Sequence, residues 1–525
     1  MDELIYPRLL LTAAARRSDR PAFVDDDGTT ELLGTHVERS LKLADAHRNH
    51  FGLAADDRYA VLAGNSRTYV NLWHAAFLGG GVLNPLNTRL APAELAFILR
   101  DSASRVLYVD AAFAPLAAAI REQVPSLEHV VLIGEGHDVA ADARPDAHFD
   151  DIVASGEPKV VDVHEDDLTV LMYTGGTTGL PKGVLHTQRT NTLNVYRLGF
   201  MFGFFTETST FLNATPMFHA GGSMGTMGMP CSGGTTVIHG TFDPGRLIAD
   251  VERYQVTHMG LVPTMIGMFV NHPDFDPAKF ASLRMLTYGA SPMPSALLDQ
   301  LHSLLPHVGL TQCYGMTEAC AVLTCLSPED HRRGGASMRS AGRASPGVEL
   351  SVRDVDGAVV PNGEVGEVWA KAGSFSVGYL GRPEETAAAF ADGWYHTGDA
   401  GYLDDEQFLY LVDRTKDMIV TGGENVYSSE VENALASHPA VLQVAVIGIP
   451  SETWGEQVHA IVVPRPGTAP TEQELIAHAR ASIAGFKAPK SVELRSDPLP
   501  LSGAMKVLKR ELRAPYWAGR ERAID

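Results

Sequence analysis

The chain has 525 residues with a mean hydropathy of −0.03, so it is long enough for several domains and has ample apolar material for their cores. Its formal net charge of −21 disfavours nucleic acid, or an anionic membrane surface, as a general partner. The 4 cysteines include no Cys-x-x-Cys pair and therefore indicate neither a disulfide framework nor a zinc site.

The sequence shows no targeting or membrane-spanning signal. The N-terminus begins acidic and lacks the positively charged region of a secretion signal. No apolar run reaches the ~18 residues that a membrane span requires. We therefore expect a cytoplasmic protein without an integral membrane segment. The basic tail from Lys506 onward allows peripheral membrane contact at most.

Short β-branched runs alternate with helix-patterned segments from residue 59 onward. This alternation predicts α/β layers with largely buried, partly parallel sheets. The predicted strands are 59–63, 106–110, 130–133, 169–173, 235–238, 258–262 and 285–288. Between residues 342 and 412 short strands and turn signals follow one another without long helices, which predicts a small β-rich subdomain.

The pattern changes again near Lys416, where we place the main domain boundary. Ser429 and Glu432 match a capping box, and the helix that they open is expected to end at His438-Pro439. Strands are predicted at 441–449 and 458–463, and a helix at 472–483. Residues 1–415 are thus expected to form a large domain, with the β-rich part at about 342–412, and residues 416–525 a compact α+β domain.

Residues 173–184 read Tyr-Thr-Gly-Gly-Thr-Thr-Gly-Leu-Pro-Lys-Gly-Val, directly after a buried-strand pattern. Glycines let a backbone approach an anion closely, and hydroxyls and a lysine add hydrogen-bond donors. The segment is not a Walker A loop, because Pro181 precedes Lys182 and Gly183 follows it. It therefore predicts a polyphosphate-binding loop of a different nucleotide fold.

Two further motifs supply acidic side chains. Tyr314 to Glu318 ends in a hydroxyl and a carboxylate, a pair of hard oxygen ligands that suits Mg²⁺. Asp399 follows Gly398 after an aromatic strand, where its carboxylate is able to accept both hydroxyls of a ribose, and Asp413-Arg414 suits the same sugar. Taken alone, each motif also fits an ordinary helix start or turn. Together with the loop they indicate a nucleotide site.

In their order and spacing, these motifs and Lys506 resemble the adenylate-forming ligases over nearly the whole chain. Residues 84–87, 216–219 and 422–425 make the chain similar to an acyl-CoA synthetase. The resemblance implies two α/β sheet subdomains and a small β-barrel in the large domain, followed by a mobile C-terminal domain. It also implies ATP, Mg²⁺ and CoA, an acyl-AMP intermediate made from a carboxylate and ATP, and transfer of the acyl group to CoA.

The resemblance assigns roles to individual residues. ATP and AMP would contact Thr174, Gly175, Gly176, Thr177, Thr178, Lys182, Gly289, Ala290, Ser291, Tyr314, Gly315, Thr317, Asp399, Arg414 and Lys506. Thr177 and Glu318 would ligate Mg²⁺. Lys506, Thr317 and His219 are the catalytic candidates. Met505 stands before Lys506, where the family usually has glycine.

Further assignments concern CoA and the acyl group. Lys416 matches the hinge of the C-terminal domain, and Gly423, Glu424, Trp454 and Lys487 would contact CoA. The acyl pocket would include Met217, His219, Met224, Gly315 and Met316. In amino-acid-activating members of the family, an aspartate at the position after Phe218 pairs with the ammonium group of the substrate. This chain has no aspartate there, so the resemblance makes an amino acid a poor candidate substrate.

We therefore expect an ATP-dependent acyl-CoA ligase of fatty acid or lipid metabolism that acts on a fatty or other apolar carboxylic acid. Three alternatives remain open. These are an aryl-CoA ligase for a cinnamate or benzoate, an acyl-AMP ligase that loads a carrier protein, and an inactive nucleotide-binding or acyl-binding protein. The sequence leaves open the chain length of the substrate, the pathway and the oligomeric state, for which a homodimer is one candidate.

Overall fold

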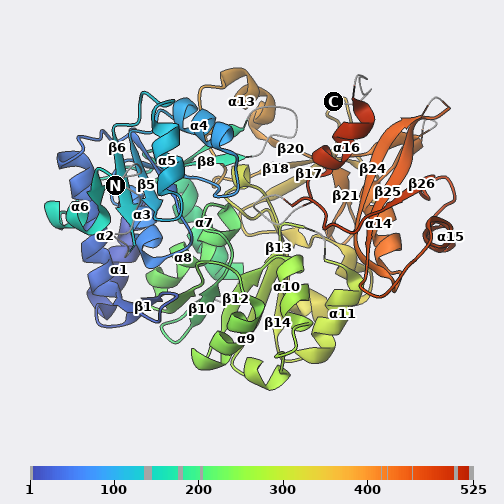
Figure 1. Cartoon of the computed structure of the whole chain (residues 1–525), viewed down its shortest axis with the longest axis horizontal. Coiled ribbons are helices and arrows are strands. Elements are labelled where there is room, and N and C mark those ends of the chain that lie inside the picture. Colours follow the sequence, from blue (N-terminus) through green and yellow to red (C-terminus); the bar gives the residue numbers. More distant parts are fainter. Residues whose placement is uncertain are drawn as a thin grey trace.

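The computed structural model describes residues 4–134, 145–174, 181–201, 205–291, 293–414, 417–421, 424–451, 453–501 and 507–518, without the side chains of residues 224, 413, 414, 420, 424 and 425. These residues form four sheets with helices packed around them. In Figure 1 the N-terminal part of the chain lies on the left, and the C-terminal unit, coloured orange to red, lies on the right.

Sheet A has nine strands in the order β16-β15-β14-β13-β12-β10-β11-β1-β2, and sheet B has eight in the order β19-β9-β8-β4-β3-β5-β6-β7. The strands of sheet A are β1 Pro21–Val24, β2 Thr30–Leu32, β10 Thr210–Asn213, β11 Thr235–Ile238, β12 His258–Leu261, β13 Met285–Gly289, β14 Gly309–Tyr314, β15 Thr324–Leu326 and β16 Arg343–Ala344. Those of sheet B are β3 Arg58–Leu62, β4 Val82–Pro85, β5 Val106–Asp110, β6 His129–Ile133, β7 Ala147–His148, β8 Leu168–Thr174, β9 Lys182–Thr187 and β19 Gly378–Tyr379. The central strands of both sheets are parallel, as the α/β alternation predicts.

Sheets C and D are smaller. Sheet C is a four-stranded antiparallel sheet of β17 Glu349–Arg353, β18 Gly366–Lys371, β20 Tyr395–Leu403 and β21 Leu409–Arg414. Sheet D has five strands: β22 Ile419–Thr421, β23 Glu424–Val426, β24 Val441–Ser451, β25 Gly455–Pro464 and β26 Ser491–Leu494. Sheet D and its helices form the separate α+β unit expected at the C-terminus.

The helices cover the faces of these sheets. In chain order the α-helices are α1 Tyr6–Arg17, α2 Leu33–Asn49, α3 Arg67–Phe77, α4 Pro92–Asp101, α5 Ala114–Arg121, α6 Phe149–Ser155, α7 Gln188–Met201, α8 Ala220–Ser232, α9 Pro244–Arg253, α10 Pro263–Val270, α11 Ser295–Leu304, α12 Pro328–Arg333, α13 Pro383–Ala389, α14 Ser428–Ala436, α15 Glu472–Ser482 and α16 Lys509–Trp517. The short 3₁₀ helices are η2 Pro277–Phe280, η3 Thr317–Ala319, η4 Gly335–Arg339 and η5 Ala391–Gly393. Helix α8 packs on strands β10, β11 and β12 of sheet A, and α7 contacts both α8 and strand β9 of sheet B.

The sequence predicts the strands of the first half of the chain well, and all seven are confirmed to within one residue at each end. One local prediction is wrong. Helix α14 begins without a side-chain cap from Ser429, whose hydroxyl donates instead to the carbonyl of Val412. Glu432 accepts a 2.8 Å hydrogen bond from the amide of Val446. Both side chains thus join α14 to neighbouring strands rather than to its own first turn.

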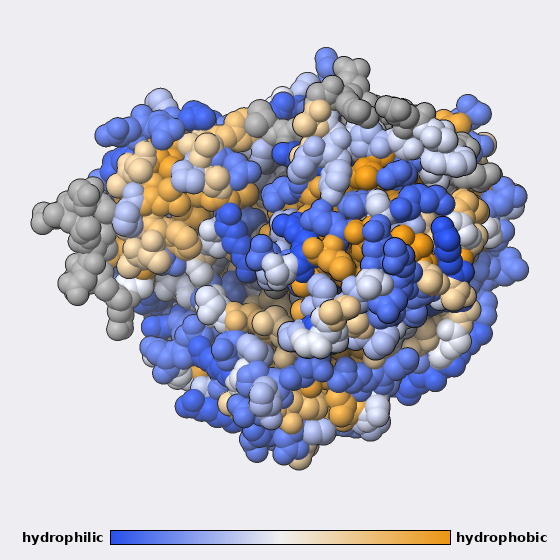
Figure 2. Space-filling model, turned by 45° about the vertical axis from the view of Figure 1, so that its right-hand side comes forward, coloured by the Kyte–Doolittle hydropathy of each residue, from blue (hydrophilic) through white to orange (hydrophobic). Residues whose placement is uncertain are grey.

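Hydrophobic side chains fill separate cores around these sheets. A large cluster that includes Tyr6, Trp73 and Met217 packs between α1, α2, α3 and sheet B, and a second cluster fills the space between sheet A and helices α9 to α11. The face drawn in Figure 2 is mostly hydrophilic, with separate hydrophobic patches. Within the described part of the chain, no helix combines the length and the hydropathy needed to cross a membrane.

Candidate nucleotide site

Tyr314 and Asp399 join the end of strand β14 in sheet A to the middle of strand β20 in sheet C. Tyr314 is the last residue of β14, and its hydroxyl donates a 2.6 Å hydrogen bond to Oδ2 of Asp399 in β20. The Asp399 carboxylate is almost fully buried, with 8% of the residue exposed. A charge-assisted hydrogen bond in such a protected place fixes both partners. The structure therefore brings together two residues that the sequence assigns to the same nucleotide.

The backbone around Asp399 is shaped by its neighbours. Gly398 has a φ of 68°, in the left-handed region that glycine adopts without strain. Its amide donates to Oε1 of Glu367 at 3.1 Å, and the Asp399 amide donates to the Thr397 hydroxyl at 3.1 Å. Asp399 lies directly opposite Arg414 in the antiparallel β20–β21 pair. The side chain of Arg414 lies outside the described residues, so its predicted ribose contact stays a prediction.

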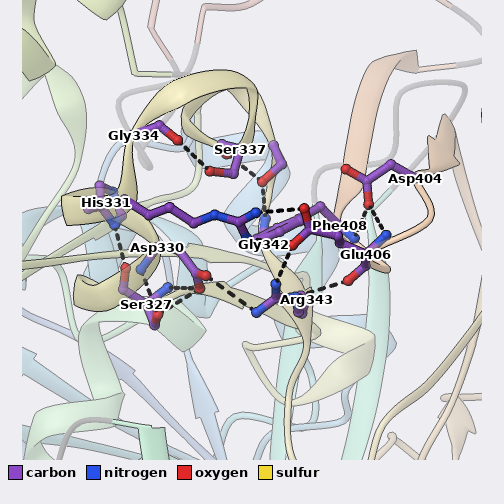
Figure 3. A network of polar contacts seen from close by, with 12 residues as sticks. Ser327, Asp330, His331, Gly334, Ser337, Gly342, Arg343, Asp404, Glu406 and Phe408 are labelled. Carbon is purple, nitrogen blue, oxygen red and sulfur yellow. Dashed lines mark hydrogen bonds and ion pairs between the residues drawn. The ribbon is translucent and has the colours of Figure 1, made fainter.

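A cluster of charged and polar side chains joins helix α12 and strand β16 to the turn between β20 and β21, as Figure 3 shows. The Arg343 guanidinium lies 3.9 Å from the centre of the Phe408 ring and donates to the carbonyl of Glu406 at 3.0 Å. It also donates to Asp330 at 3.3 Å. Backbone hydrogen bonds connect Leu409 with Ala341 and Gly342. These contacts hold the hairpin that carries Asp399 against the edge of sheet A.

Glu318 lies in the 3₁₀ helix η3, just after β14. The Tyr379 hydroxyl donates a 3.0 Å hydrogen bond to Oε1 of Glu318. Burial and the negative charge of Glu318 both raise the pKa of Tyr379, so the phenol stays protonated and remains a donor. Tyr379 belongs to β19, which pairs with β9 at the edge of sheet B. No sequence pattern points to Tyr379, because a strand of two residues leaves no periodic signal.

Lys182 is the first residue of β9 and pairs across the β8–β9 ladder with Thr174. Its ammonium group forms an ion pair with Glu385 of α13 and lies 5.2 Å from the centre of the Tyr379 ring. The Lys182 hydrogen bond lowers the pKa of Glu385. Both side chains of the pair are about one third exposed, at 34% and 38%. Tyr379 therefore lies between the lysine and Glu318, and Glu385 is a second residue that the sequence analysis did not identify.

Residues 175–180 carry the centre of the predicted phosphate loop and lie outside the described residues. The assignments of Gly175, Gly176, Thr177 and Thr178 therefore stay predictions. Only the two ends of the loop are described, at Thr174 and at Lys182.

The predicted adenine-binding residues lie at the carboxyl ends of neighbouring parallel strands. Gly289 ends β13, and a Cβ there would lie 2.3 Å from the carbonyl oxygen of Cys313. A Cβ on Gly315 would lie 1.9 Å from the carbonyl oxygen of Ala321. Ala290 has a φ of 67°, and Ser291 follows it. Glycine is thus required at positions 289 and 315 by close approach of the backbone.

One buried histidine, His186, lies in strand β9 of sheet B. His186 in β9 is 2% exposed, and burial lowers its pKa to about 4. The imidazole is therefore neutral near pH 7. Nothing in the sequence distinguishes this histidine beyond its place in a β-strand.

The predicted acyl-pocket residues lie in different environments. His219 is the residue before α8, and its ring centre is 4.7 Å from that of Phe218. Met217 is fully buried in the core that contains Tyr6 and Trp73. Met316 directly precedes η3, and the Met224 side chain lies outside the described residues. The pocket assignment stays a prediction for all of them.

The predicted CoA residues in the C-terminal unit are only partly described. Lys487 lies 2.8 Å from both carboxylate oxygens of Glu430, and Trp454 is half exposed. Lys416, Gly423 and Lys506 lie outside the described residues, as does the side chain of Glu424. Their predicted roles in hinge motion, CoA binding and catalysis stay predictions.

The sequence matches two family models of known proteins. Residues 10–380 match the family model of the AMP-binding enzymes, and residues 430–506 match that of the AMP-binding enzyme C-terminal domain. The chain is 34% identical over 536 residues to a fatty acid–acyl-carrier-protein ligase from Streptomyces coeruleorubidus, with 100% of both chains covered. It is 36% identical over 507 residues to a feruloyl-CoA synthase from an Amycolatopsis species, covering 96% of this chain and 97% of the relative.

A solved structure is similar over nearly the same length. It is the o-succinylbenzoate CoA synthetase from Bacillus subtilis in complex with the acyl-adenylate intermediate OSB-AMP. The TM-score is 0.83 at 29% sequence identity, and the match covers 96% of this chain and 97% of the other. With two family models matched in sequence order and relatives aligned over their full lengths, the chain belongs to the AMP-binding enzyme family.

Proposed function

We propose that this protein is an ATP-dependent, AMP-forming ligase that joins an apolar carboxylic acid to CoA through an acyl-AMP intermediate. The observation that carries the proposal is the placement of Tyr379 between Lys182 and Glu318. The Lys182 ammonium group, a cation suited to phosphates, lies over the face of the Tyr379 ring. The Glu318 carboxylate, suited to Mg²⁺, accepts a hydrogen bond from the hydroxyl of the same ring. The Tyr314–Asp399 pair adds a buried carboxylate suited to a ribose. Relatives named as acyl-CoA and aryl-CoA ligases support the same reaction.

The chain's own residues suit a bound Mg²⁺–ATP. Glu318 is partly exposed and offers carboxylate oxygens, which are the ligands that Mg²⁺ prefers. No group of three or more potential metal-binding side chains occurs in the described part of the chain, so phosphate oxygens and water would complete the coordination. Glu318 and Thr177 would hold the ion. When bound, Mg²⁺ neutralises charge on the phosphate oxygens.

The proposed reaction needs positioning rather than an enzyme nucleophile. In the first step a carboxylate oxygen of the substrate bonds to the α-phosphorus of ATP, and the bond to pyrophosphate breaks. In the second step the sulfur of CoA bonds to the acyl carbon, and AMP leaves with the electrons of the broken carbon–oxygen bond. Lys182 would bind the leaving phosphates, and Lys506 would stabilise charge on the reacting oxygens. Asp399 would hold the ribose in place throughout.

The two steps require different partners at one site, so we propose that the C-terminal unit rotates about Lys416 between them. In the adenylating arrangement Lys506 would reach the α-phosphate. In the thioester-forming arrangement Gly423 and Glu424 would take its place, and Trp454 and Lys487 would contact CoA. Lys487 would then exchange Glu430 for a CoA phosphate.

A second candidate is transfer of the acyl group to a carrier protein instead of CoA. The observation that favours it is the full-length similarity to a fatty acid–acyl-carrier-protein ligase. Both candidates share the adenylation step and differ only in the thiol that accepts the acyl group.

The experiment that tests the proposal is pyrophosphate release with ATP and Mg²⁺ over a panel of alkyl and aryl acids, each with CoA, with a phosphopantetheinylated carrier protein, or with neither. We expect turnover that depends on an acid and is increased by CoA. An increase with the carrier protein alone would select the second candidate. Absence of release with every acid would contradict both.

Lys506→Ala separates the two half-reactions. We expect acyl-AMP formation to fall by at least about 10²-fold, because a charge-stabilising donor is lost, while thioester formation from supplied acyl-AMP is retained. The matched control is Lys490→Ala, which removes an exposed lysine of the same unit. Equal losses in both half-reactions would contradict the assigned role of Lys506.

A further inference from the structure

Two of the cysteines lie directly opposite each other in sheet A. Cys313 of β14 and Cys325 of β15 are paired residues of this antiparallel ladder, and both are free thiols. Directly opposite residues of an antiparallel pair have Cα atoms about 4.5–5.5 Å apart. A disulfide spans Cα separations of about 4.4–6.8 Å. The sheet register therefore holds the two thiols, which we call the dithiol, within the range that a disulfide is able to bridge.

The other two cysteines have different neighbours. The Cys320 thiol donates a hydrogen bond to Oδ1 of Asn191 at 3.5 Å. The Cys231 thiol donates to the carbonyl of Met227 at 3.3 Å, within helix α8. Each of these thiols thus has a polar partner of its own, whereas the dithiol is brought together by strand pairing.

The two members of the dithiol differ in exposure. Cys313 is buried, with 9% exposed, and packs against Leu198 and Val322. Cys325 is partly exposed. The neighbouring Cys325 thiol, and then burial, raise the pKa of Cys313. We therefore expect a small oxidant to react first at Cys325, with Cys313 held beside the oxidised sulfur.

The dithiol lies at the base of the loop that carries two predicted ligands of Mg²⁺–ATP. The chain leaves β14 after Tyr314, passes through Thr317 and Glu318 in η3, and returns in β15. At the base of the loop the amide of Leu323 donates to the carbonyl of Tyr314 at 2.8 Å. A movement of either strand at this base would therefore be passed on to Thr317 and Glu318.

Cys313 also adjoins the predicted contacts to adenine and ribose. A Cβ on Gly289 would lie 2.3 Å from the carbonyl oxygen of Cys313 and 3.6 Å from its Cβ, so the two strands are in close contact there. The next residue, Tyr314, holds the Asp399 carboxylate through its hydroxyl. A displacement of Cys313 would thus disturb several parts of the candidate nucleotide site together.

We propose that the dithiol is a reversible oxidation site, which a hydroperoxide converts to a disulfide that slows adenylation. The bond itself is independent of the proposed function, whereas its effect on adenylation rests on that function. The Cys325 sulfur attacks the O–O bond of hydrogen peroxide, which forms a sulfenic acid and releases water. The Cys313 sulfur then attacks the Cys325 sulfur, and the sulfenic oxygen leaves with the thiol proton as a second water. The two sulfurs together lose two electrons, and the peroxide gains them.

Closing the bond should change the geometry of the loop base. Cβ atoms of directly opposite residues lie about 4.5–5.5 Å apart, whereas a disulfide brings them to about 3.8 Å. The strands must therefore shift by about 1 Å, and a misplacement of this size is able to slow catalysis by about 10²-fold. The accompanying strain also makes the bond easy to reduce, which makes the change reversible.

The test treats the reduced full-length enzyme with hydrogen peroxide, removes the peroxide with catalase and measures two quantities. Peptide mass spectrometry uses cleavage after Glu318 and Leu323, which places the three neighbouring cysteines on separate peptides. It should find Cys313 joined to Cys325. Pyrophosphate release with ATP, Mg²⁺ and an accepted acid should fall by about ten-fold or more and should return with dithiothreitol.

Cys325→Ser should keep its activity and resist peroxide, because the sulfur that reacts first is absent. Cys231→Ser is the matched control, because it makes the same change at a partly exposed cysteine of α8. Peroxide should inactivate it like the wild-type enzyme. If Cys325→Ser does not fold, as judged by circular dichroism, the peptide map and activity of the wild-type enzyme decide the question alone.

The outcomes separate this inference from the proposed function. Absence of the link between Cys313 and Cys325, or a link that leaves pyrophosphate release unchanged, would overturn the inference and leave the proposed function intact. Inactivation of Cys325→Ser by peroxide to the same extent as the wild-type enzyme would also overturn it. Lack of release with every acid before oxidation would overturn the proposed function and the effect on adenylation, and the peptide map would still decide whether the bond forms.

Discussion

Sheets A and D use their two faces differently. In sheet D, alternate residues of β24 enter two cores: Val446 packs with α14 and α15, whereas Ile447 packs with Leu512 of α16. In sheet A the outer face joins one continuous core with helices α9 to α11, whereas part of the inner face carries small, partly exposed residues such as Gly260, Thr287 and Gly289. Faces lined by large buried side chains are tightly packed, whereas a stretch of small, partly exposed residues contributes less to the core. Two described residues of this unit with predicted CoA contacts, Glu424 and Trp454, lie at the start of β23 and in the turn before β25 of sheet D.

Truncating buried side chains on the packed faces of sheets A and D should have the largest effect on the free energy of unfolding. Ile447→Ala in sheet D and Leu286→Ala on the outer face of sheet A each empty a fully buried position. We expect each to lower the free energy of unfolding of its unit by about 2–5 kcal/mol. Thr287→Ala on the inner face should cost less than about 1 kcal/mol. Urea denaturation measures all three, and a loss for Thr287→Ala as large as that for Leu286→Ala would remove the distinction between the faces.

The pH dependence of stability should report the burial of His258 in strand β12 of sheet A. Burial lowers the pKa of His258 to about 4, below its value of about 6.5 in an unfolded chain. Because the unfolded chain then binds more protons, stability is fully present above pH 6.5 and is lost as the pH falls toward 4. The difference amounts to about 3 kcal/mol. His258→Gln should therefore flatten the decline of the urea midpoint between pH 7 and 4.5.

Exposed His50 provides the control for this measurement. His50→Gln should leave the slope unchanged. Other buried histidines, among them His47 and His331, also have pKa values lowered to about 4 and will keep part of the decline in every variant. An unchanged slope in His258→Gln would show that this ring is protonated or exposed in the native protein.

A smaller effect on stability is expected for Tyr516 of α16, which packs on the second face of sheet D. The Tyr516 hydroxyl donates a 2.6 Å hydrogen bond to Glu493 and lies 3.0 Å from Nε2 of His459. Tyr516→Phe keeps the ring and removes these contacts, so we expect a loss of about 1 kcal/mol. Thermal unfolding followed by circular dichroism tests it. A loss similar to that of Ile447→Ala would mean that polar contacts, rather than packing, hold α16 on the sheet.

The smallest effect should come from the edge of sheet A. Arg333 and Glu406 form an ion pair in which each side chain is about half exposed. Such exposed pairs contribute little to stability and are screened by salt. Arg333→Gln should therefore change stability only slightly, and not at all in about 1 M salt. A large loss would indicate that this edge cluster, rather than either face, stabilises sheet A.

Most of the fold was predictable from local sequence, because buried parallel strands form continuous β-branched runs. The runs at 106–110 and 235–238 match their strands at both ends. The prediction failed at Ser429, because a side chain that suits a helix cap formed a tertiary contact instead. The site was harder to predict. Tyr379 and Glu385 reach it only through the pairing of β19 with β9 and the placement of α13, neither of which leaves a periodic pattern.

The ion pair between Lys182 and Glu385 affects which anions are able to bind at Lys182. In the resting protein the charge of the lysine is already neutralised by a residue of the same chain. An incoming anion must replace a carboxylate that is permanently tethered nearby, at high effective concentration. Singly charged anions such as chloride are poor competitors under these conditions, whereas a polyphosphate with several charges has the advantage. We therefore expect Glu385 to leave the lysine accessible mainly to ligands of high charge density.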